Sequence, residues 1–320
     1  MSDYTEAVRA RAKQLLSSGE VKVVIGHARG TTPYRARPHM ATSPEAAESL
    51  IHDVTCSGNL AVYVNKPKER VAVIGKGCDA RSLITCIGEG QAERGQVLII
   101  GVACEGKLDE ERLLARLDFP PRQIKAIRED GEDVVVEGPA GEVRVVRDEV
   151  IMGTCTWCRV RTPAVADELI GEPVSPRETA DAYPDLAELE AMTEAERAAF
   201  WHEQLSKCIR CYACRNACPM CYCPECFVDE YHPQWALHGG GQFRGNWMFH
   251  MGRAQHLAGR CSSCASCERA CPVGIPLMLL NRWMERAAKE SLDHMAGMSE
   301  EQKQLPALFR KGESKVTGNG

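Results

Sequence analysis

Short apolar runs alternate with helix-like segments through the first half of this sequence. The runs are rich in valine and isoleucine and therefore favour strands. They are VKVVIG (21–26), NLAVYV (59–64), VAVIG (71–75), VLIIGVAC (97–104), VVVEG (134–138) and VRVV (143–146). The runs 71–75 and 97–104 lack polar alternation, as expected of parallel strands buried on both faces, and residues 82–89 between them can form a crossover helix. The pattern predicts an α/β domain with a mostly parallel or mixed sheet.

Turn and capping signals give the domain boundaries. The segment VEGPAGEVRVV predicts a hairpin that turns at residues 139–141, and the stretch 171–184, rich in proline and acidic residues, predicts a linker. Thr193 and Glu196 have the spacing of a capping box, which predicts that a helix begins there. We therefore expect an α/β domain over residues 1–170, a linker over 171–192, an all-α domain over 193–311 and a disordered tail over 312–320.

The composition excludes some classes of protein and leaves the predicted domain boundaries unchanged. The chain is 44% hydrophobic and 26% charged, as soluble proteins usually are, and its net charge of -5 provides no basic surface for nucleic acid. No apolar run is long enough to cross a bilayer, and residues 1–16 predict an amphipathic helix of mixed charge rather than a signal peptide. We expect a cytoplasmic protein that inserts into no membrane itself and reaches one only through partners.

The unusual feature of the composition is its 17 cysteines. Disulfides are typical of short secreted domains that lack a large core. This chain is long, shows no export signal and groups its thiols at C-x-x-C spacing, which indicates metal ligands instead. Six cysteines lie between positions 56 and 158 and eleven between 208 and 271, so we expect two metal-binding regions.

The second region contains one cysteine pattern twice. C-x-x-C-x-x-C-x-x-x-C-P occurs at residues 208–219 and again at 261–272. Three thiolates on one loop can bind three irons of a 4Fe-4S cluster, and in two-cluster ferredoxins the fourth cysteine of each run binds the other cluster. We assign Cys208, Cys211, Cys214 and Cys271 to one cluster and Cys261, Cys264, Cys267 and Cys218 to the other. An all-thiolate zinc site is the alternative, but it needs two C-x-x-C pairs rather than four cysteines in one run.

The long insertion between the two runs indicates a helical scaffold. Residues 247–261 have helical spacing, and His250 and His256 within them are interpreted as packing and hydrogen-bonding neighbours of a cluster rather than as ligands. The residues HLAGRC (256–261), CERACPVGIPL (267–277) and LLNRWME (279–285) resemble the α-helical dicluster ferredoxin domains of heterodisulfide reductase, fumarate reductase and ion-pumping ferredoxin oxidoreductase subunits.

Three further cysteines follow the first run in PMCYCPEC, and neither cluster requires them. Cys221, Cys223 and Cys226 are consistent with a further cluster or zinc site completed by a distant thiol, for which Cys56 is a candidate. Two other interpretations stay open. The thiols can approach the two clusters without binding them, or they can be small buried residues.

In the α/β domain, cysteines stand at the ends of predicted strands. Cys78 follows VAVIG, Cys104 ends VLIIGVAC, and Cys155 and Cys158 follow a third predicted strand in IMGTCTWC. Because the carboxyl ends of strands in an open α/β sheet form the ligand crevice, these four thiols can converge on a third 4Fe-4S cluster. The alternative is a set of separate buried thiols, an interpretation that suits Cys86 in its predicted helix better than it suits a C-x-x-C pair.

The same residues carry a resemblance to a known family. The segments GKGCDARSL (75–83), IIGVACEG (99–106) and GTCTWCRVRTP (153–163) with ADELIG (166–171) resemble the beta subunits of coenzyme F-420-reducing hydrogenase and F-420-dependent formate dehydrogenase. The resemblance implies an FAD-binding α/β domain with a nearby iron-sulfur cluster, which passes electrons between a hydride carrier and one-electron centres. This chain differs in placing its dicluster module after the α/β domain, whereas those subunits usually have ferredoxin motifs in front.

One turn of the sequence offers a candidate site for a flavin phosphate. Gly75, Lys76 and Gly77 follow a predicted strand, so their backbone N–H groups could receive a phosphate that pairs with Arg81. A simple βα turn is the alternative, since no G-x-G-x-x-G pattern follows any strand.

These features predict an iron-sulfur electron-transfer subunit of a larger redox complex. No Ser-His-Asp set, Walker loop or supported carboxylate pair indicates hydrolysis or phosphoryl transfer, and no catalytic residue is assigned. The expected partner is a heterodisulfide-reductase-like flavoprotein, a hydrogenase or a formate dehydrogenase. One alternative is an FAD-containing oxidoreductase that acts directly on F-420 or a related hydride carrier. Another is a zinc-stapled assembly module without redox function.

Overall fold

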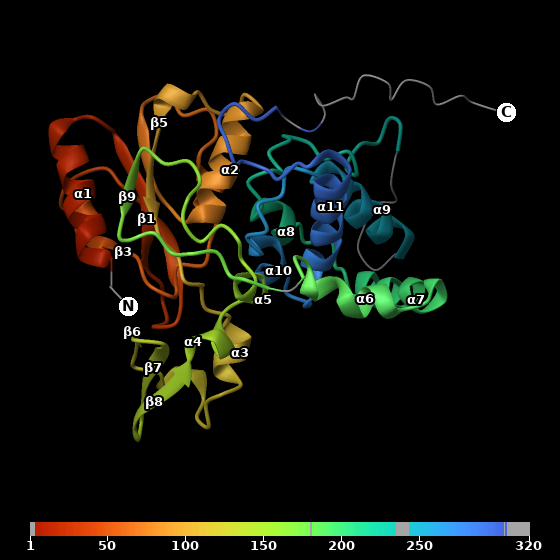
Figure 1. The fold of residues 1–320 in the computed structure, drawn as a ribbon, viewed down its shortest axis with the longest axis horizontal. Coiled ribbons are helices and arrows are strands. Elements are labelled where there is room, and N and C mark those ends of the chain that lie inside the picture. The colour runs from red at the N-terminus through yellow and green to blue at the C-terminus, as the bar shows by residue number, and fades with distance from the viewer. Residues whose placement is uncertain (1–3, 180, 235–242, 304, 306–320) are drawn as a thin grey trace.

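The structure is a computed structural model that describes residues 4–179, 181–234, 243–303 and 305. An α/β part and a helical part lie side by side, and a small second sheet lies below the α/β part in the view of Figure 1. The last strand of the α/β part ends at Ile170, and the first long helix of the helical part begins at Glu194. The predicted fold class is confirmed. The predicted disordered tail, 312–320, lies outside the described residues.

The main sheet is mixed. Its strands are β1 (Val23–Arg29), β2 (Ala36–Ala41), β3 (Leu50–Ile51), β4 (Val71–Gly75), β5 (Val97–Val102) and β9 (Glu168–Ile170). The order is β2-β1-β4-β5-β9, with β3 also paired to β1. The pairs β1–β4, β4–β5 and β5–β9 are parallel, whereas β2 and β3 are antiparallel to β1. Every residue of β4 and β5 is buried, as the absence of polar alternation predicted.

Helices cover both faces of this sheet because alternate residues of its central strands point to opposite sides. Helix α1 (Thr5–Ser18) packs on the face that contains Ile74 and Ile100. Helix α2 (Gly77–Gly88) packs on the face that contains Ile99. The predicted crossover helix is therefore confirmed, and it begins earlier than the sequence indicated.

The run 59–64 was predicted as a strand, and this prediction is wrong. Its residues form the short 3-10 helix η2 (Leu60–Tyr63). The Asn59 side chain accepts a hydrogen bond from the N–H of Ala61 at 3.0 Å, and the N–H of Leu60 donates to Asp79 Oδ1 at 2.7 Å. These bonds satisfy the first N–H groups of a helical turn, so the segment does not need a strand neighbour.

The predicted hairpin is confirmed. It consists of β7 (Asp133–Gly138) and β8 (Gly141–Val146), which form a separate antiparallel sheet with β6 (Ala126–Asp130). The short helices of the α/β part are η1 (Ala46–Ser49), η3 (Arg94–Gln96), α3 (Glu110–Leu114), η4 (Pro121–Gln123), α4 (Arg147–Val150) and α5 (Gly153–Thr156).

The helical part begins with the predicted capping box. The N–H of Glu196 donates to Thr193 Oγ1 at 3.3 Å, the Glu196 carboxylate accepts the N–H of Thr193 at 2.8 Å, and helix α7 follows. The helices of this part are η5 (Pro184–Leu186), α6 (Ala187–Ala191), α7 (Glu194–Ser206), α8 (Ala213–Asn216), α9 (Phe243–His256), α10 (Ser266–Arg269) and α11 (Leu277–Leu292). The first two lie inside the predicted linker, where Leu186 and Leu189 are buried. Within the described ranges, no helix is long and apolar enough to span a membrane.

Buried polar contacts join the two parts. Arg81 of α2 donates to the backbone oxygens of Ala296, Ser262 and Cys261, at 2.7, 3.2 and 3.4 Å. A Cβ at Gly297 would lie 2.0 Å from the backbone oxygen of Arg81, and Gly297 has a φ of +67°, so glycine permits both the close approach and the backbone conformation. The second cysteine run is thereby held against α2.

Candidate iron-sulfur sites

The two cysteine runs have the same local conformation. The residues two and four positions after the first cysteine have positive φ in each run, namely Arg210 and Tyr212 in the first and Ser263 and Ala265 in the second. In each run, the N–H two positions after the first cysteine donates to that cysteine's sulfur, at 3.4 Å for Cys208 and 3.3 Å for Cys261. Positive φ is uncommon for residues other than glycine, so the repetition indicates one tightly turned loop built twice.

Three thiols of the second run share a cavity with one thiol of the first. The cavity has a volume of about 20 Å³, and its lining includes Cys218, Cys261, Cys264 and Cys267. These are the four cysteines that crossed ligation assigns to one cluster. Burial raises the pKa of Cys267 to about 12, so the free thiol keeps its proton at neutral pH and iron binding would release it.

The remaining cysteine of the second run, Cys271, lies with the first run. Burial is the main cause that raises the pKa of Cys208, and the charges of Cys271 and Cys211 raise it further, which indicates that these thiols are neighbours. Burial also raises the pKa of Cys214 to about 12, again with a contribution from Cys271. Among the described residues, no three His, Cys, Asp or Glu side chains could hold a single metal ion. A 4Fe-4S cluster does not require thiols to meet at one point, because each thiolate binds a different iron.

Polar side chains contact the thiols of both groups. His250 Nε2 of α9 lies 3.3 Å from Cys208 Sγ, and Asn281 Nδ2 of α11 donates to Cys267 Sγ at 3.5 Å. Hydrogen bonds to cluster sulfurs stabilise the more negative, reduced state. His256 does not take part, since its ring packs edge-on against Phe227 with centroids 5.1 Å apart.

The α/β part brings its four predicted thiols to one edge of the main sheet. Cys78 lies in the first turn of α2 directly after β4, and Cys104 follows β5. Because β4 and β5 are adjacent and parallel, their carboxyl ends open at the same edge. Cys155 and Cys158 come from α5 and the turn after it, not from a third strand as the sequence predicted. The N–H of Cys104 donates to the backbone oxygen of Arg161 at 2.8 Å, which fixes this turn beside β5.

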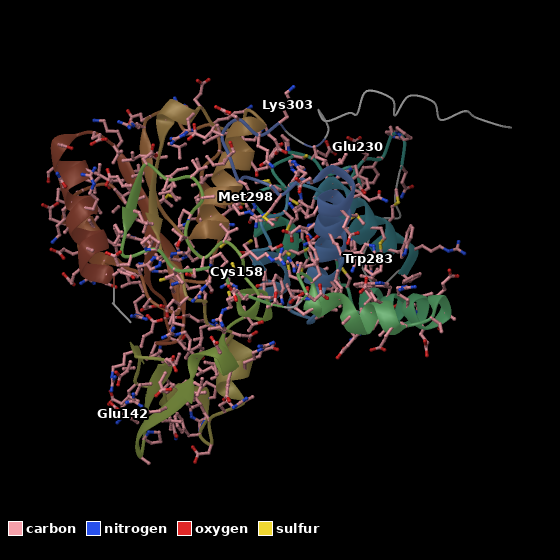
Figure 2. All side chains as sticks on the ribbon, viewed as in Figure 1. Glu142, Cys158, Glu230, Trp283, Met298 and Lys303 are labelled. Carbon is pink, nitrogen blue, oxygen red and sulfur yellow. The ribbon has the colours of Figure 1, made fainter. Side chains whose placement is uncertain are left out.

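The four thiols line one cavity between the two parts of the molecule. This interface cavity has a volume of about 60 Å³, and its walls include Cys78, Cys104, Cys155 and Cys158. Figure 2 shows Cys158 at the boundary between the α/β part and the helices. Cys264 lines both the interface cavity and the smaller cavity of the second run. Ser262 also lines both cavities, so a single short segment of the second run separates the third candidate site from a dicluster site.

The surroundings of the interface cavity favour metal-bound thiolates. Burial raises the pKa of Cys155 to about 12 and also raises the pKa of Cys78 and Cys158, so coordination is needed to deprotonate them near neutral pH. The buried ammonium of Lys107 lines the cavity. Its Nζ donates to Asp53 O at 2.8 Å and lies 3.3 Å from a histidine ring nitrogen. Burial lowers the pKa of Lys107, and the charges of Cys104, Cys56 and Glu129 raise it above its usual value, so this ammonium acts on the Glu129 carboxylate as well as on the thiols.

The turn predicted for a flavin phosphate is occupied by the protein's own groups. Lys76 Nζ lies 2.7 Å from Asp79 Oδ2 and donates to Gly58 O at 2.9 Å. The Arg81 guanidinium is bound to backbone oxygens of the helical part. A Cβ at Gly77 would meet Val160 O at 2.0 Å, although Lys76, Gly77 and Arg81 also line the interface cavity. The side chains of Lys76 and Arg81 thus already have protein partners, and a flavin phosphate at Gly75, Lys76, Gly77 and Arg81 stays a prediction beside the interpretation as a simple βα turn.

The extra cysteines are not brought together with Cys56. Cys221 shares a hydrogen bond with the Cys218 thiol, which lowers the pKa of Cys221 to about 7. Cys223 is exposed, and Cys226 packs against the core of the helical part. The Cys56 thiol is fully buried in the α/β part, where it contacts Ile51 O at 3.7 Å. The position of Cys221 matches the interpretation of a thiol that approaches a cluster.

One wall of the interface cavity was missed from the sequence. The Arg282 guanidinium carbon lies 3.6 Å from the centroid of the Trp157 ring and 4.4 Å from that of Tyr183. All three residues line the cavity. The sequence offered one local indication of this wall. Trp157 lies between Cys155 and Cys158, so its large ring stays close to both thiols. Arg282 and Tyr183 carry no such signal.

Known proteins resemble both parts of the chain. Residues 204–275 match the 4Fe-4S dicluster domain family. The chain is 25% identical to the beta subunit of F-420-dependent formate dehydrogenase from Methanocaldococcus jannaschii over 363 aligned positions, which cover 95% of this chain and 93% of that protein. It is also 25% identical to the beta subunit of F-420-dependent formate dehydrogenase 1 from Methanococcus maripaludis, over 69% of this chain and 73% of that protein.

Among solved structures, one chain of the F-420-reducing NiFe hydrogenase complex from Methanosarcina barkeri aligns with a TM-score of 0.41 and 14% identity, over 50% of this chain and 60% of that one. The resemblance stated from the sequence is confirmed by the formate dehydrogenase relatives and the domain match. This chain is similar along nearly its whole length to the beta subunit of an F-420-dependent formate dehydrogenase and contains a 4Fe-4S dicluster domain.

Proposed function

We propose that this chain is an iron-sulfur electron-transfer subunit of a multi-subunit redox complex, with a formate dehydrogenase, a hydrogenase or a heterodisulfide-reductase-like flavoprotein as partner. The dicluster domain supports the redox role, and the relatives, which are named as subunits, support a place in a complex. The observation that carries the proposal is the position of Cys264, which borders two thiol-lined cavities. Single electrons can pass between centres that share such a wall.

The proposed ligands follow the three groups of thiols. Cys208, Cys211, Cys214 and Cys271 would hold the first cluster, Cys261, Cys264, Cys267 and Cys218 the second, and Cys78, Cys104, Cys155 and Cys158 the third. Bound 4Fe-4S clusters supply one-electron transfer. The protein buries Cys208, Cys214 and Cys267. Asn281 donates a hydrogen bond to Cys267 Sγ, His250 lies within hydrogen-bonding distance of Cys208 Sγ, and Lys107 lines the cavity of the third group.

The domain boundaries belong to the same proposal. The α/β domain over residues 1–170 would carry the third cluster, and the helical domain over 193–311 would carry the other two. Residues 171–192 would connect them as a partly helical linker, since η5 and α6 lie within it.

The test is metal and flavin analysis of the full chain purified without oxygen, with an absorption spectrum and EPR of the reduced protein. We expect about twelve irons per chain, four for each cluster, and no stoichiometric flavin. Zinc without iron would instead support an assembly module. Bound FAD together with direct reduction by reduced F-420 would support the flavin enzyme. Iron or zinc beyond three clusters would indicate a further site at Cys221, Cys223 and Cys226.

Gly77→Ala is expected to remove the third cluster and to leave the other two. An added Cβ would lie 2.0 Å from the backbone oxygen of Val160, so the Cys158 segment would have to move away from Cys78. Iron content should fall by about a third, with the dicluster EPR signals retained.

The control for this substitution is Gly95→Ala, because a Cβ at that position meets nothing within 4 Å and the residue has no positive φ. It should keep the iron content of the unmodified protein. Full iron content in Gly77→Ala would show that the Cys78 and Cys158 segments do not jointly hold a cluster.

A further inference from the structure

Helix α11 contains an arginine that lies between two aromatic rings of other segments. The Arg282 guanidinium carbon is 3.6 Å from the centroid of the Trp157 ring and 4.4 Å from that of the Tyr183 ring. All three residues are at most 8% exposed. On the same helix, the guanidinium carbon of Arg286 lies 5.1 Å from the Trp283 ring, and the Arg286 side chain is 21% exposed. The Arg282 contacts are closer and exclude more water, and a cation–π contact is stronger where water is excluded.

Hydrogen bonds fix the orientation of this guanidinium. Nη1 of Arg282 donates to Glu285 Oε2 at 2.9 Å, and Nη2 donates to the backbone oxygen of Ala182 at 2.8 Å. Nε donates to Asp185 Oδ2 at 3.4 Å. A planar group held through three of its nitrogens cannot turn freely, so the Trp157 ring packs against a rigid surface.

Trp157 belongs to the turn that contains two thiols of the third group. The N–H of Cys158 donates to the backbone oxygen of Cys155 at 3.4 Å, which closes residues 155–158 into one turn. Helix α5, which overlaps this turn, has only four residues, and an isolated helix of that length is not stable in water. The turn therefore depends on tertiary contacts, and the contact of Trp157 with Arg282 is one of them.

The same arginine is connected to the second cysteine run. Its partner Glu285 also accepts a hydrogen bond from Ser263 Oγ. Ser263 is the residue before Cys264, which lines both the interface cavity and the smaller cavity. A continuous chain of side-chain contacts therefore joins the C-x-x-C turn of the α/β part to the loop of the second run.

We propose that Trp157 and Arg282 form a clamp that holds the thiols of the third cluster in a fixed position beside the second cysteine run. This inference rests on the proposed function, because it requires a cluster at the third group of thiols. Both are positioning residues, since they act on the cluster through the turn that contains Cys155 and Cys158. The clamp keeps the third cluster bound and next to the cluster with which it exchanges electrons.

The test follows iron release from the full chain, purified without oxygen and incubated with an iron chelator, together with EPR of the reduced protein. Trp157→Leu keeps an apolar side chain without the ring, and it should release about four of roughly twelve irons about tenfold faster than the unmodified protein does. The dicluster EPR signals should remain. Trp157→Phe retains an aromatic face and should release iron more slowly than Trp157→Leu does. Arg282→Lys retains the charge without the planar group and should behave like Trp157→Leu.

Trp283→Leu is the matched control. Trp283 also contacts arginines, Arg286 at 5.1 Å and Arg197 at 5.8 Å, but it lines a separate apolar groove of the helical part. This variant should release iron as the unmodified protein does. A double variant of Trp157→Leu and Arg282→Lys should release iron no faster than the more affected single variant, because both changes remove the same contact. Effects that multiply would show that the two residues act independently and would contradict the clamp.

Unchanged iron release in Trp157→Leu and Arg282→Lys would overturn the inference. Release of all three clusters together would also overturn it, because that result would indicate loss of the whole fold. If Trp157→Leu does not fold, Arg282→Lys decides by the same criterion. Unmodified protein with about eight irons would lack the third cluster and would overturn that part of the proposed function itself. The two failures are distinguishable, since a failed clamp leaves the unmodified protein with its full iron content.

Discussion

Cys271→Ser should remove the cluster held by the first cysteine run, although residue 271 lies in the second run. The Cys271 thiol neighbours Cys208 and Cys214. The smaller cavity of the second run is lined by Cys218 of the first run and not by Cys271. Serine is a poor ligand here because its hydroxyl keeps its proton at neutral pH and its oxygen is a harder donor than sulfur. Iron content should fall by about four atoms per chain. Cys218→Ser should remove the other cluster.

Each of these two variants is compared with a second variant that removes another ligand of the same proposed cluster. The EPR spectrum of reduced Cys271→Ser should match that of Cys211→Ser, and the spectrum of Cys218→Ser should match that of Cys264→Ser. The opposite matches would mean that each run binds its own cluster. That result would contradict crossed ligation while leaving two clusters in place.

Arg81→Met should cause the largest loss of stability among single substitutions at the boundary of the two parts. Arg81 is 5% exposed, donates to three backbone oxygens of the helical part, and its Nη2 lies 3.6 Å from the carboxylate of Glu285, which is 4% exposed. Methionine fills part of the space but leaves these acceptors unpaired. We expect a loss of about 3 kcal/mol, seen as a decrease of roughly 6–12 °C in the thermal unfolding midpoint.

Arg94→Met is the matched control for this prediction. Arg94 also reaches from the α/β part to the last described segment, with Glu300 at 2.7 Å, but its side chain is 31% exposed. Exposed ion pairs contribute less than about 1 kcal/mol, so the unfolding midpoint should change by a few degrees at most. Equal decreases in both variants would show that Arg81 does not hold the two parts together more firmly than a surface ion pair.

Local patterns predicted the elements whose determinants lie close together in sequence. Strands β4 and β5 were found because their apolar residues are continuous, and α7 was found because Thr193 and Glu196 satisfy each other's N–H groups. The run 59–64 failed because its partner is Asp79, whose carboxylate binds the N–H of Leu60 across the βα turn. Such a contact has no signature in local periodicity.

Some features of the candidate sites could likewise be predicted from local sequence, and others could not. Spacing alone indicated the two cysteine runs and their exchange of fourth ligands, and strand ends indicated where Cys78 and Cys104 would lie. The position of Cys264 between two cavities, and the contacts of Arg81 with residues about 180 to 215 positions away, depend on how the two parts pack. No pattern within a short window contains that information. The partners of Arg81 in the helical part were unforeseen for this reason.

The proposed exchange of thiols between the two runs also determines when the clusters can be loaded. As the chain leaves the ribosome, Cys208, Cys211 and Cys214 emerge well before Cys271, and Cys218 emerges well before the loop that contains Cys261. The proposed site of Cys218 and the second run has its full ligand set only once residue 267 has been made, and the proposed site of the first run only once residue 271 has been made. Cluster insertion must therefore follow the synthesis of both runs, and a chain truncated between them would offer iron only incomplete sites.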